Sequence, residues 1–210
     1  MTDTDADADL AGGDEARPGR RSVALLVLSC VVSVVVLGGA LAAPVVARLA
    51  GYERTPADLS GVVTYDITDR SHTEADLDYP QAPPAGGDHA PVWLDCGVYD
   101  VPVREENAVH DLEHGTVWIT HDPSLSQSDL GLLADALPDN GIMSPRDDLS
   151  APVVVTVWGA QLALDRASDE RLALFLAAYG DGHTAPEVGV TCHGGTPDPS
   201  GAVPQPGVGV

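Results

Sequence analysis

The sequence VHDLEHG at residues 109–115, followed by TVWITH at 116–121, decides the fold expected for this chain. Side chains three and four residues apart share one face of a helix, so a helix here places His110, Glu113 and His114 together. A glycine such as the one that ends the first segment is typical of the position after the last helical turn. The β-branched and aromatic residues after it predict a strand. The stretch therefore predicts a short helix that ends at its own histidines and leads directly into a strand.

Further elements are expected on either side of this unit. Pro102 precedes the helix, and Glu105 and Glu106 suit its positively charged N-terminal end, which predicts a helix over 104–114. Residues 138–152 are expected to form a loop. Apolar spacing and turn residues predict the remaining elements, which are strands over 61–67, 116–121, 153–158 and 162–164 and helices over 126–137 and 168–179. This order predicts an α+β domain, a small mixed or antiparallel sheet with helices packed on it.

An uncharged apolar run, SVALLVLSCVVSVVVLGGALAA at residues 22–43, stands near the N-terminus. Its 22 residues would form roughly 33 Å of helix at ~1.5 Å per residue, enough to cross a bilayer core of about 30 Å. The sequence therefore predicts one transmembrane helix, preceded by a disordered acidic tail with a basic flank over 1–21 and followed by a linker over 44–60. A signal peptide cleaved near Ala43 is the alternative, and either one exports residues 51–210.

The charges around the apolar run indicate its orientation. Three arginines precede it within residues 17–21, whereas Arg48 alone follows closely, and this bias places the N-terminus in the cytoplasm. The sequence thus predicts a single-pass protein of the cell membrane. Its extracytoplasmic domain is expected over 61–195, followed by a flexible tail over 196–210.

Three cysteines are present, and Cys30 lies inside the apolar run. Cys96 and Cys192 fall in the exported part, where disulfides persist, so one bridge between them is expected. Two free buried thiols are the alternative.

The charge of the chain argues against one class of partner. The sequence carries 32 acidic residues against ten basic residues, all of them arginine, for a formal charge of −22. Such a surface repels nucleic acid and attracts cations, so no nucleic-acid partner is expected. The simplest interpretation of the acidity is that it keeps a small domain soluble.

The paired histidines are candidate metal ligands. His110 and His114 lie about 6 Å apart along a helix axis, so both can bind one divalent ion through imidazole nitrogens. Glu113 could be a further ligand or could orient a ring. A third histidine, His89, stands in the loop PQAPPAGGDHAP at 80–91, where two glycines allow a close approach to the helix. Three imidazoles predict zinc or copper(II) rather than copper(I), which prefers sulfur ligands.

Two other functions stay open. The spacing His-x-x-Glu-His also occurs in inverzincin metallopeptidases, which would make Glu113 the general base of a metal-dependent hydrolase. Those enzymes carry the motif within a longer helix, whereas Gly115 ends this one, so no catalytic residue is assigned and an enzyme is not the favoured interpretation. The other alternative is a structural or interaction domain without a metal, in which the histidines bond only to the backbone or to the helix end.

The remaining histidines are expected to be structural. His72 stands in a polar stretch and is expected on the surface, and His121 ends a strand. His183 is isolated, and His193 follows Cys192. The tryptophans are expected in the core or at its rim: Trp93, Trp118 and Trp158.

Four motifs occur in order along the domain: YPQAPPAGGDHAPVWLDCGVYDVPV, ENAVHDLEHGTVWITHDPSL, PVVVTVWGAQLALD and APEVGVTCHGG. Together they resemble the DUF3105 family, domains of unknown function that are often membrane-anchored and frequent in actinobacteria. The resemblance covers 61–195 and implies that Pro83–His89, the Cys-Gly-Val-Tyr that begins at Cys96, and His110–Gly115 form the family's signature. His121 departs from the family, which more often has tyrosine there. The resemblance implies the extent and topology of the domain, and it implies no activity.

Overall fold

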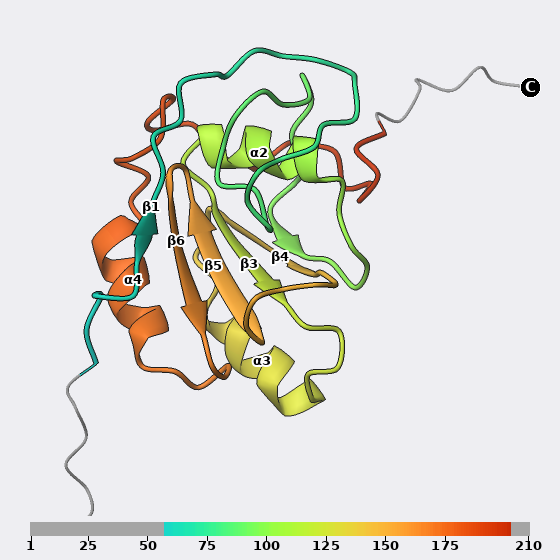
Figure 1. The fold of residues 1–210 in the computed structure, drawn as a ribbon. Coiled ribbons are helices and arrows are strands. Elements are labelled where there is room, and N and C mark those ends of the chain that lie inside the picture. The colour runs from blue at the N-terminus through green and yellow to red at the C-terminus, as the bar shows by residue number, and fades with distance from the viewer. Residues whose placement is uncertain (1–56, 203–210) are drawn as a thin grey trace, which may run out of the picture. The chain divides into compact units, whose positions relative to one another are not determined.

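The computed structural model describes residues 57–202, which form one sheet and three helices (Figure 1). The strands are β1 (Val63–Thr64), β2 (Gly97–Val98), β3 (Val117–His121), β4 (Gly141–Pro145), β5 (Val153–Val157) and β6 (Ala160–Leu164). The helices are α2 (Glu105–Glu113), α3 (Gln127–Ala136) and α4 (Arg171–Tyr179).

The strands form a mixed sheet in the order β1-β6-β5-β3-β4-β2. The pairs β1–β6, β6–β5 and β5–β3 are antiparallel, whereas β4 runs parallel to both β3 and β2. β5 and β6 join through a two-residue turn at Trp158 and Gly159, where the glycine adopts a φ of 71°. The expected α+β class is confirmed, and the sheet is the mixed rather than the antiparallel alternative.

β4 corrects the sequence prediction, which expected only a loop over 138–152. Its sequence, GIMSP, combines glycine, serine and proline and has little strand propensity of its own. Pairing with β3 along its whole length holds it in the sheet, and α3 supplies the crossover that a parallel pair requires. β2 was missed as well, because only Gly97 and Val98 pair with β4.

The ends of two predicted elements also differ. β1 pairs with β6 only at Val63 and Thr64, inside the longer strand that was expected. The helix expected from Ser168 begins at Arg171 instead, with Glu170 as its N-cap residue and no side-chain cap. The Asp169 carboxylate, one residue earlier, accepts the Arg171 N–H at 3.0 Å.

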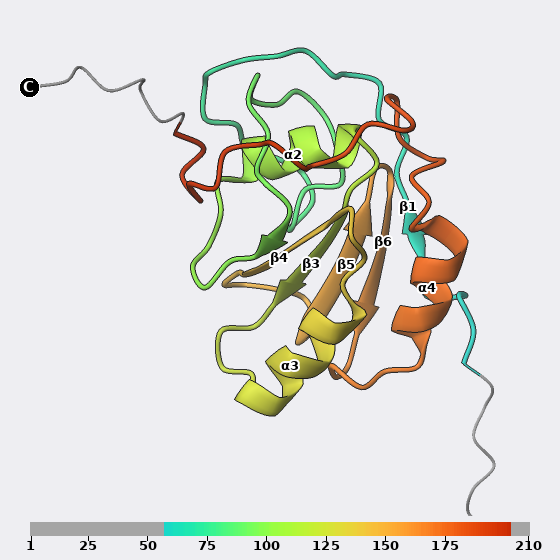
Figure 2. The same ribbon diagram turned by 180° about the vertical axis from the view of Figure 1, so that it is seen from behind.

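One face of the sheet, here called the apolar face, is covered by α3 and α4 (Figure 2). Alternate residues of β5, namely Val153, Val155 and Val157, point into this layer. Leu133 of α3 and Phe175 of α4 are fully buried against them. This layer is the larger hydrophobic core of the described residues.

The opposite face, here called the polar face, carries α2 and the long loops that precede it. Val109 and Leu112 of α2 pack with Trp118 of β3 and Ile142 of β4 in a second hydrophobic cluster. Buried polar side chains stand on the strands of this face: Thr120, Ser144, Thr156 and Gln161. Figure 1 shows α2 at the end of the sheet where β3 begins, with the loops folded over it. This end of the molecule brings the histidines together.

The predicted transmembrane helix over 22–43, the tail over 1–21 and most of the linker over 44–60 lie outside the described residues. Within residues 57–202, no helix is both long enough and apolar enough to cross a membrane. The chain keeps contact with the domain beyond residue 195, since the Arg104 N–H donates to the Pro199 carbonyl at 2.8 Å.

Candidate metal centre

Helix α2 supplies two candidate ligands, His110 and Glu113, which are three residues apart and share one face. The helix is buried from Glu106 to its end. It stops where the sequence predicts, at Gly115, whose φ of 81° suits glycine and whose N–H donates to the Leu112 carbonyl at 3.0 Å. The short helix therefore presents both side chains from its last turn.

Two loop segments each bring one histidine to this helix. The His89 N–H donates to the Ser71 carbonyl at 3.0 Å, and the His89 carbonyl accepts the Thr73 N–H at 2.7 Å. This short parallel pairing places His72 beside His89, with ring centroids 4.8 Å apart. Backbone hydrogen bonds, rather than side-chain attraction, thus set the spacing of the two loop histidines.

His72, His89, His110 and Glu113 form the candidate metal centre. One possible ligand atom from each lies within 4.8 Å of the others. Glu113 Oε2 is 2.9 Å from His89 Nε2 and 4.0 Å from His72 Nε2. Two ligands of one zinc ion, each about 2 Å from it, stand at most about 4 Å apart, so a small closing movement would suffice to coordinate a metal.

Backbone carbonyls fix the rings of the two buried histidines. His89 Nδ1 is 2.8 Å from the Gly87 carbonyl, and His110 Nδ1 is 2.6 Å from the Ala90 carbonyl. A carbonyl only accepts, so each Nδ1 carries the proton and donates it. In the neutral form of each ring, Nε2 is then the nitrogen without a proton, the arrangement in which an outer hydrogen bond orients a metal-binding histidine.

His89 gives the strongest indication of a cation site. The residue is fully buried, and its Nε2 satisfies no hydrogen bond with the described residues. The atom that faces it is a carboxylate oxygen of Glu113 at 2.9 Å. An unprotonated nitrogen and a carboxylate repel each other at this distance, unless a proton or a metal cation lies between them. The geometry therefore fits either a shared proton or two ligands that face one ion.

Burial keeps the helix histidines in the form that binds metals. It lowers the pKa of His110 to about 4, against the opposing effect of the hydrogen bond to the Ala90 carbonyl. Burial also lowers the pKa of His114, although the nearby Glu187 and Glu113 carboxylates act in the opposite direction. Because a neutral imidazole is the metal-binding form, His110 needs no deprotonation at neutral pH.

His114 lies beside the centre and outside the group of four. Its Nε2 is 3.1 Å from His110 Nε2 and 3.5 Å from Glu187 Oε2. The Trp93 ring covers both histidines, with centroids 5.5 Å from His110 and 5.1 Å from His114. The structure thus groups three of the four predicted ligands, and His72 stands with them instead of His114.

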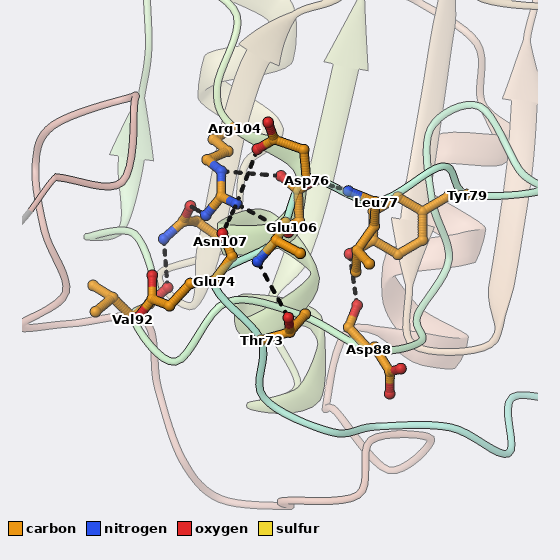
Figure 3. Close-up of polar contacts among 11 residues, drawn as sticks. Thr73, Glu74, Asp76, Leu77, Tyr79, Asp88, Val92, Arg104, Glu106 and Asn107 are labelled. Atoms are coloured by element: carbon orange, nitrogen blue, oxygen red, sulfur yellow. Dashed lines mark hydrogen bonds and ion pairs between the residues drawn. The ribbon is translucent and has the colours of Figure 1, made fainter.

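A polar network holds the segment that follows His72, from Thr73 to Leu77 (Figure 3). Glu106 Oε1 accepts the Leu77 N–H at 2.7 Å, and Glu106 Oε2 pairs with Arg104 Nε at 3.2 Å. The same guanidinium reaches Asp76 Oδ1 at 3.3 Å. The start of α2 therefore fixes the chain a few residues beyond His72, while the end of α2 supplies the other ligands.

The expected disulfide between Cys96 and Cys192 is present, with Cα atoms 5.0 Å apart. The Cys192 carbonyl accepts the indole N–H of Trp93 at 3.2 Å, and the Cys192 N–H donates to Asn140 Oδ1 at 2.9 Å. The bridge thereby anchors the tryptophan that covers the candidate centre.

His72 is the member of the group that the sequence did not reveal. Its side chain is half-exposed, as its polar neighbours in the sequence suggest, and no local spacing relates it to the other three. The other histidines lie apart from the centre: His121 is in β3 on the apolar face, and the exposed His183 and His193 pair with Asp181 and Asp139. A contact made by backbone pairing of distant loops leaves no periodic signal in a single sequence.

Fold and site together define a small, disulfide-bonded α+β domain with a buried cluster of histidines and a glutamate. The family model for proteins of unknown function called DUF3105 matches residues 71–194, a range that includes all four grouped residues and both cysteines. The chain belongs to the DUF3105 family. No curated protein and no solved structure matches it.

Proposed function

We propose that this domain binds one divalent transition-metal ion through His72, His89, His110 and Glu113. The observation that carries the proposal is the buried His89 Nε2, which lacks a hydrogen bond and lies 2.9 Å from the Glu113 carboxylate. A metal ion between these two atoms would replace repulsion by two bonds. The three imidazoles and one carboxylate would then complete a four-coordinate site.

The donor set favours zinc or copper(II). Imidazole nitrogen suits both ions, and a carboxylate oxygen is a common fourth ligand for zinc. Copper(I) prefers thiolate or thioether, and the two cysteines of the described residues are joined in the disulfide. The half-exposed His72 side chain gives such a site a solvent-facing ligand through which an ion could enter.

The arrangement supports binding over hydrolysis. A metal-dependent hydrolase needs a free base beside the ion and an open coordination position for water. Glu113 is the expected base, yet it lies among the grouped ligands and faces His89 directly. A structural domain without a metal is the remaining alternative, and it requires a buried proton between His89 and Glu113 in place of the ion.

We also propose that the domain lies outside the membrane, tethered by residues 22–43 with the N-terminus in the cytoplasm. The uncharged run and its flanking arginines support the tether. The Cys96–Cys192 disulfide supports an oxidising compartment, since such bridges are rare in reducing cytosol. Fusing a reporter that is active only outside the cytoplasm to the C-terminus tests this orientation, and an inactive reporter on a stable fusion contradicts it.

Metal analysis of the purified full chain tests the binding proposal. After dialysis against zinc or copper(II) and then metal-free buffer, we expect about one ion per chain, measured by elemental mass spectrometry. His89→Gln and Glu113→Gln should each lose most of the ion. His183→Gln, which changes an exposed histidine paired with Asp181, is the matched control and should keep it.

Two results would contradict the proposal. One is a wild-type chain that retains neither ion although it is folded by circular dichroism. The other is equal metal content in the wild type and in both site variants. His114→Gln refines the ligand set. The variant should lose the ion if His114 coordinates it, and should keep the ion if His114 only lies beside the site.

A further inference from the structure

A separate cavity of about 720 Å³ lies beside α3, at the edge of the sheet formed by β4 and β2. Met143 and Pro145 of β4 and Leu130 and Ala134 of α3 line it with apolar surface, and Tyr99 joins them from the segment after β2. Figure 2 shows α3 crossing this face of the sheet, away from α2. The volume is in the range of pockets that hold small molecules, roughly 300–1,000 Å³.

His121 is a polar exception on the apolar face. The strand residues of β3 to β6 that face α3 and α4 are otherwise apolar, whereas this one is a histidine that lines the cavity. It is only 5% exposed, and its Nδ1 donates to the Asp122 carbonyl at 3.0 Å. Among the described residues its Nε2 has no hydrogen-bond partner. In the neutral ring that nitrogen can accept a hydrogen bond.

Gly131 keeps the cavity open in the middle of α3. A Cβ added at this position would meet nothing within 4 Å, and the residue lines the cavity. Glycine inside a helix costs about 1 kcal/mol relative to alanine. No neighbouring atom requires a glycine here, so packing does not explain this loss of helix stability. The missing side chain leaves room for a ligand.

The charge of the cavity is negative. Two exposed aspartates, Asp100 and Asp147, line it, and its lining contains no arginine. The chain has no lysine and a formal charge of −22, which strengthens the attraction for a cation. An apolar floor, a hydrogen-bond acceptor and carboxylates at the opening match a molecule with an apolar body and a cationic donor.

We propose that this cavity binds a small amphipathic amine. Its ammonium group donates to His121 Nε2 and lies near Asp100 and Asp147, and its apolar body packs on Met143 and Leu130. The site is independent of the metal centre, which lies by α2 on the polar face. A lysine side chain of a partner protein offers similar chemistry, but the size of the cavity favours a small molecule.

Calorimetric titration of the purified full chain with 2-phenylethylamine tests the proposal. We expect the amine to bind and 2-phenylethanol, which has the same shape without the charge, to bind about tenfold more weakly or not at all. The anion 3-phenylpropanoate should not bind. Absence of amine binding at millimolar concentration, or equal binding of the alcohol, overturns the proposal. So does binding of a lysine-containing peptide by a chain that does not bind the amine.

Gly131→Leu should abolish amine binding, because its side chain occupies the cavity. The variant should fold, since leucine favours a helix and meets no atom near its Cβ. Ser128→Leu, on the same helix and outside the cavity lining, is the matched control and should bind normally. Retained binding by the folded Gly131→Leu variant overturns the proposal.

Removing one cavity carboxylate tests the role of charge. Asp147→Asn should weaken amine binding about fivefold, in keeping with one exposed ion pair. Asp135→Asn is the matched control: it also removes one negative charge, but Asp135 lies on α3 and does not line the cavity. This substitution should leave binding unchanged. Equal effects of the two substitutions would mean that only the overall charge matters, which overturns the assigned position of the ammonium group.

Discussion

The two faces of the sheet bury different kinds of side chain. On the apolar face, β5 contributes three buried valines that pack against Phe175 and Leu133 of the covering helices. On the polar face, the strands carry buried threonine, serine and glutamine, and α2 adds the buried Glu106 and His110. Burying polar groups stabilises a protein only when each finds a partner. The apolar face therefore holds the larger hydrophobic core, and the polar face combines a smaller one with the groups of the candidate centre.

The two faces also differ in how the chain reaches them. The apolar face is formed by regular elements that follow one another in the sequence, from β3 to α4. The centre on the polar face combines α2 with loop residues His72 and His89, which pair through the backbone. A helix and two irregular segments must dock together before the four side chains meet. Stability and binding should thus respond to different substitutions.

The largest loss of stability is expected on the apolar face. Phe175→Ala removes a fully buried ring and should lower the free energy of unfolding by about 3–5 kcal/mol, measured by urea denaturation. Leu174→Ala, its exposed neighbour on the same helix, should change it by less than about 1 kcal/mol. The folded fraction of the Phe175→Ala variant should still bind one metal ion. Loss of metal without loss of stability would show that the two faces are not separable in this way.

An intermediate effect, on binding rather than on stability, is expected from the network at the start of α2. Glu106→Gln weakens the pair with Arg104 that holds the segment beyond His72. Loss of such outer support commonly weakens metal binding about 10–100-fold. We expect about tenfold weaker binding in a competition titration with a chromophoric chelator.

Glu105→Gln is the matched control for this substitution. Glu105 is adjacent on the same helix, but its partner is Arg146 at 2.7 Å and not the segment near His72. Its substitution should leave metal affinity unchanged. Equal weakening by both variants would place the effect in the charge or stability of α2, not in the support of His72.

The smallest effect is expected from the ion pair at the start of α4. The hydrogen bond from the Arg171 guanidinium holds the pKa of Asp169 at about 2, below its usual value of 3.8. A lowered pKa in the folded state stabilises the protein above the unfolded pKa, and this stabilisation is lost as pH falls from about 4 towards 2. Asp169→Asn should cost about 1 kcal/mol at neutral pH and progressively less below pH 4.

Denaturation at several pH values checks this last expectation. Asp165→Asn is the control, because Asp165 approaches the same arginine at 3.5 Å but is largely exposed. It should show a smaller dependence on pH. A cost of Asp169→Asn that stays constant from neutral pH down to pH 3 would contradict the role assigned to the charged pair.

The sequence predicted the elements whose signal is local. The helix that ends at Gly115 and the strand after it depend on residues adjacent to each other, and both were found within a residue or two. β4 was not predicted, because its strand conformation depends on pairing with β3 and its own glycine and proline indicate a loop. Which sheet type would form was also left open, since strand order depends on contacts between distant segments.

The candidate centre divides in the same way. Helical spacing alone was enough to predict that His110 and Glu113 share a face, and the loop glycines suggested that His89 could come close. His72 could not be predicted, because its place depends on two backbone hydrogen bonds to His89. His114 shows the opposite limit: its spacing fits a ligand, but the helix ends at that residue and its ring turns to Glu187 as well as to His110.

The disulfide has a consequence for proteolysis. Cys96 and Cys192 are 96 residues apart, and the covalent loop they close contains α2, α3, α4 and the strands β2 to β6. A single cut anywhere within that loop leaves both pieces joined until a reductant is added. His72 and His89 precede the loop, whereas His110 and Glu113 lie inside it. A bound metal would therefore tie the segment before the covalent loop to the loop itself, and should protect that segment from digestion where the disulfide cannot.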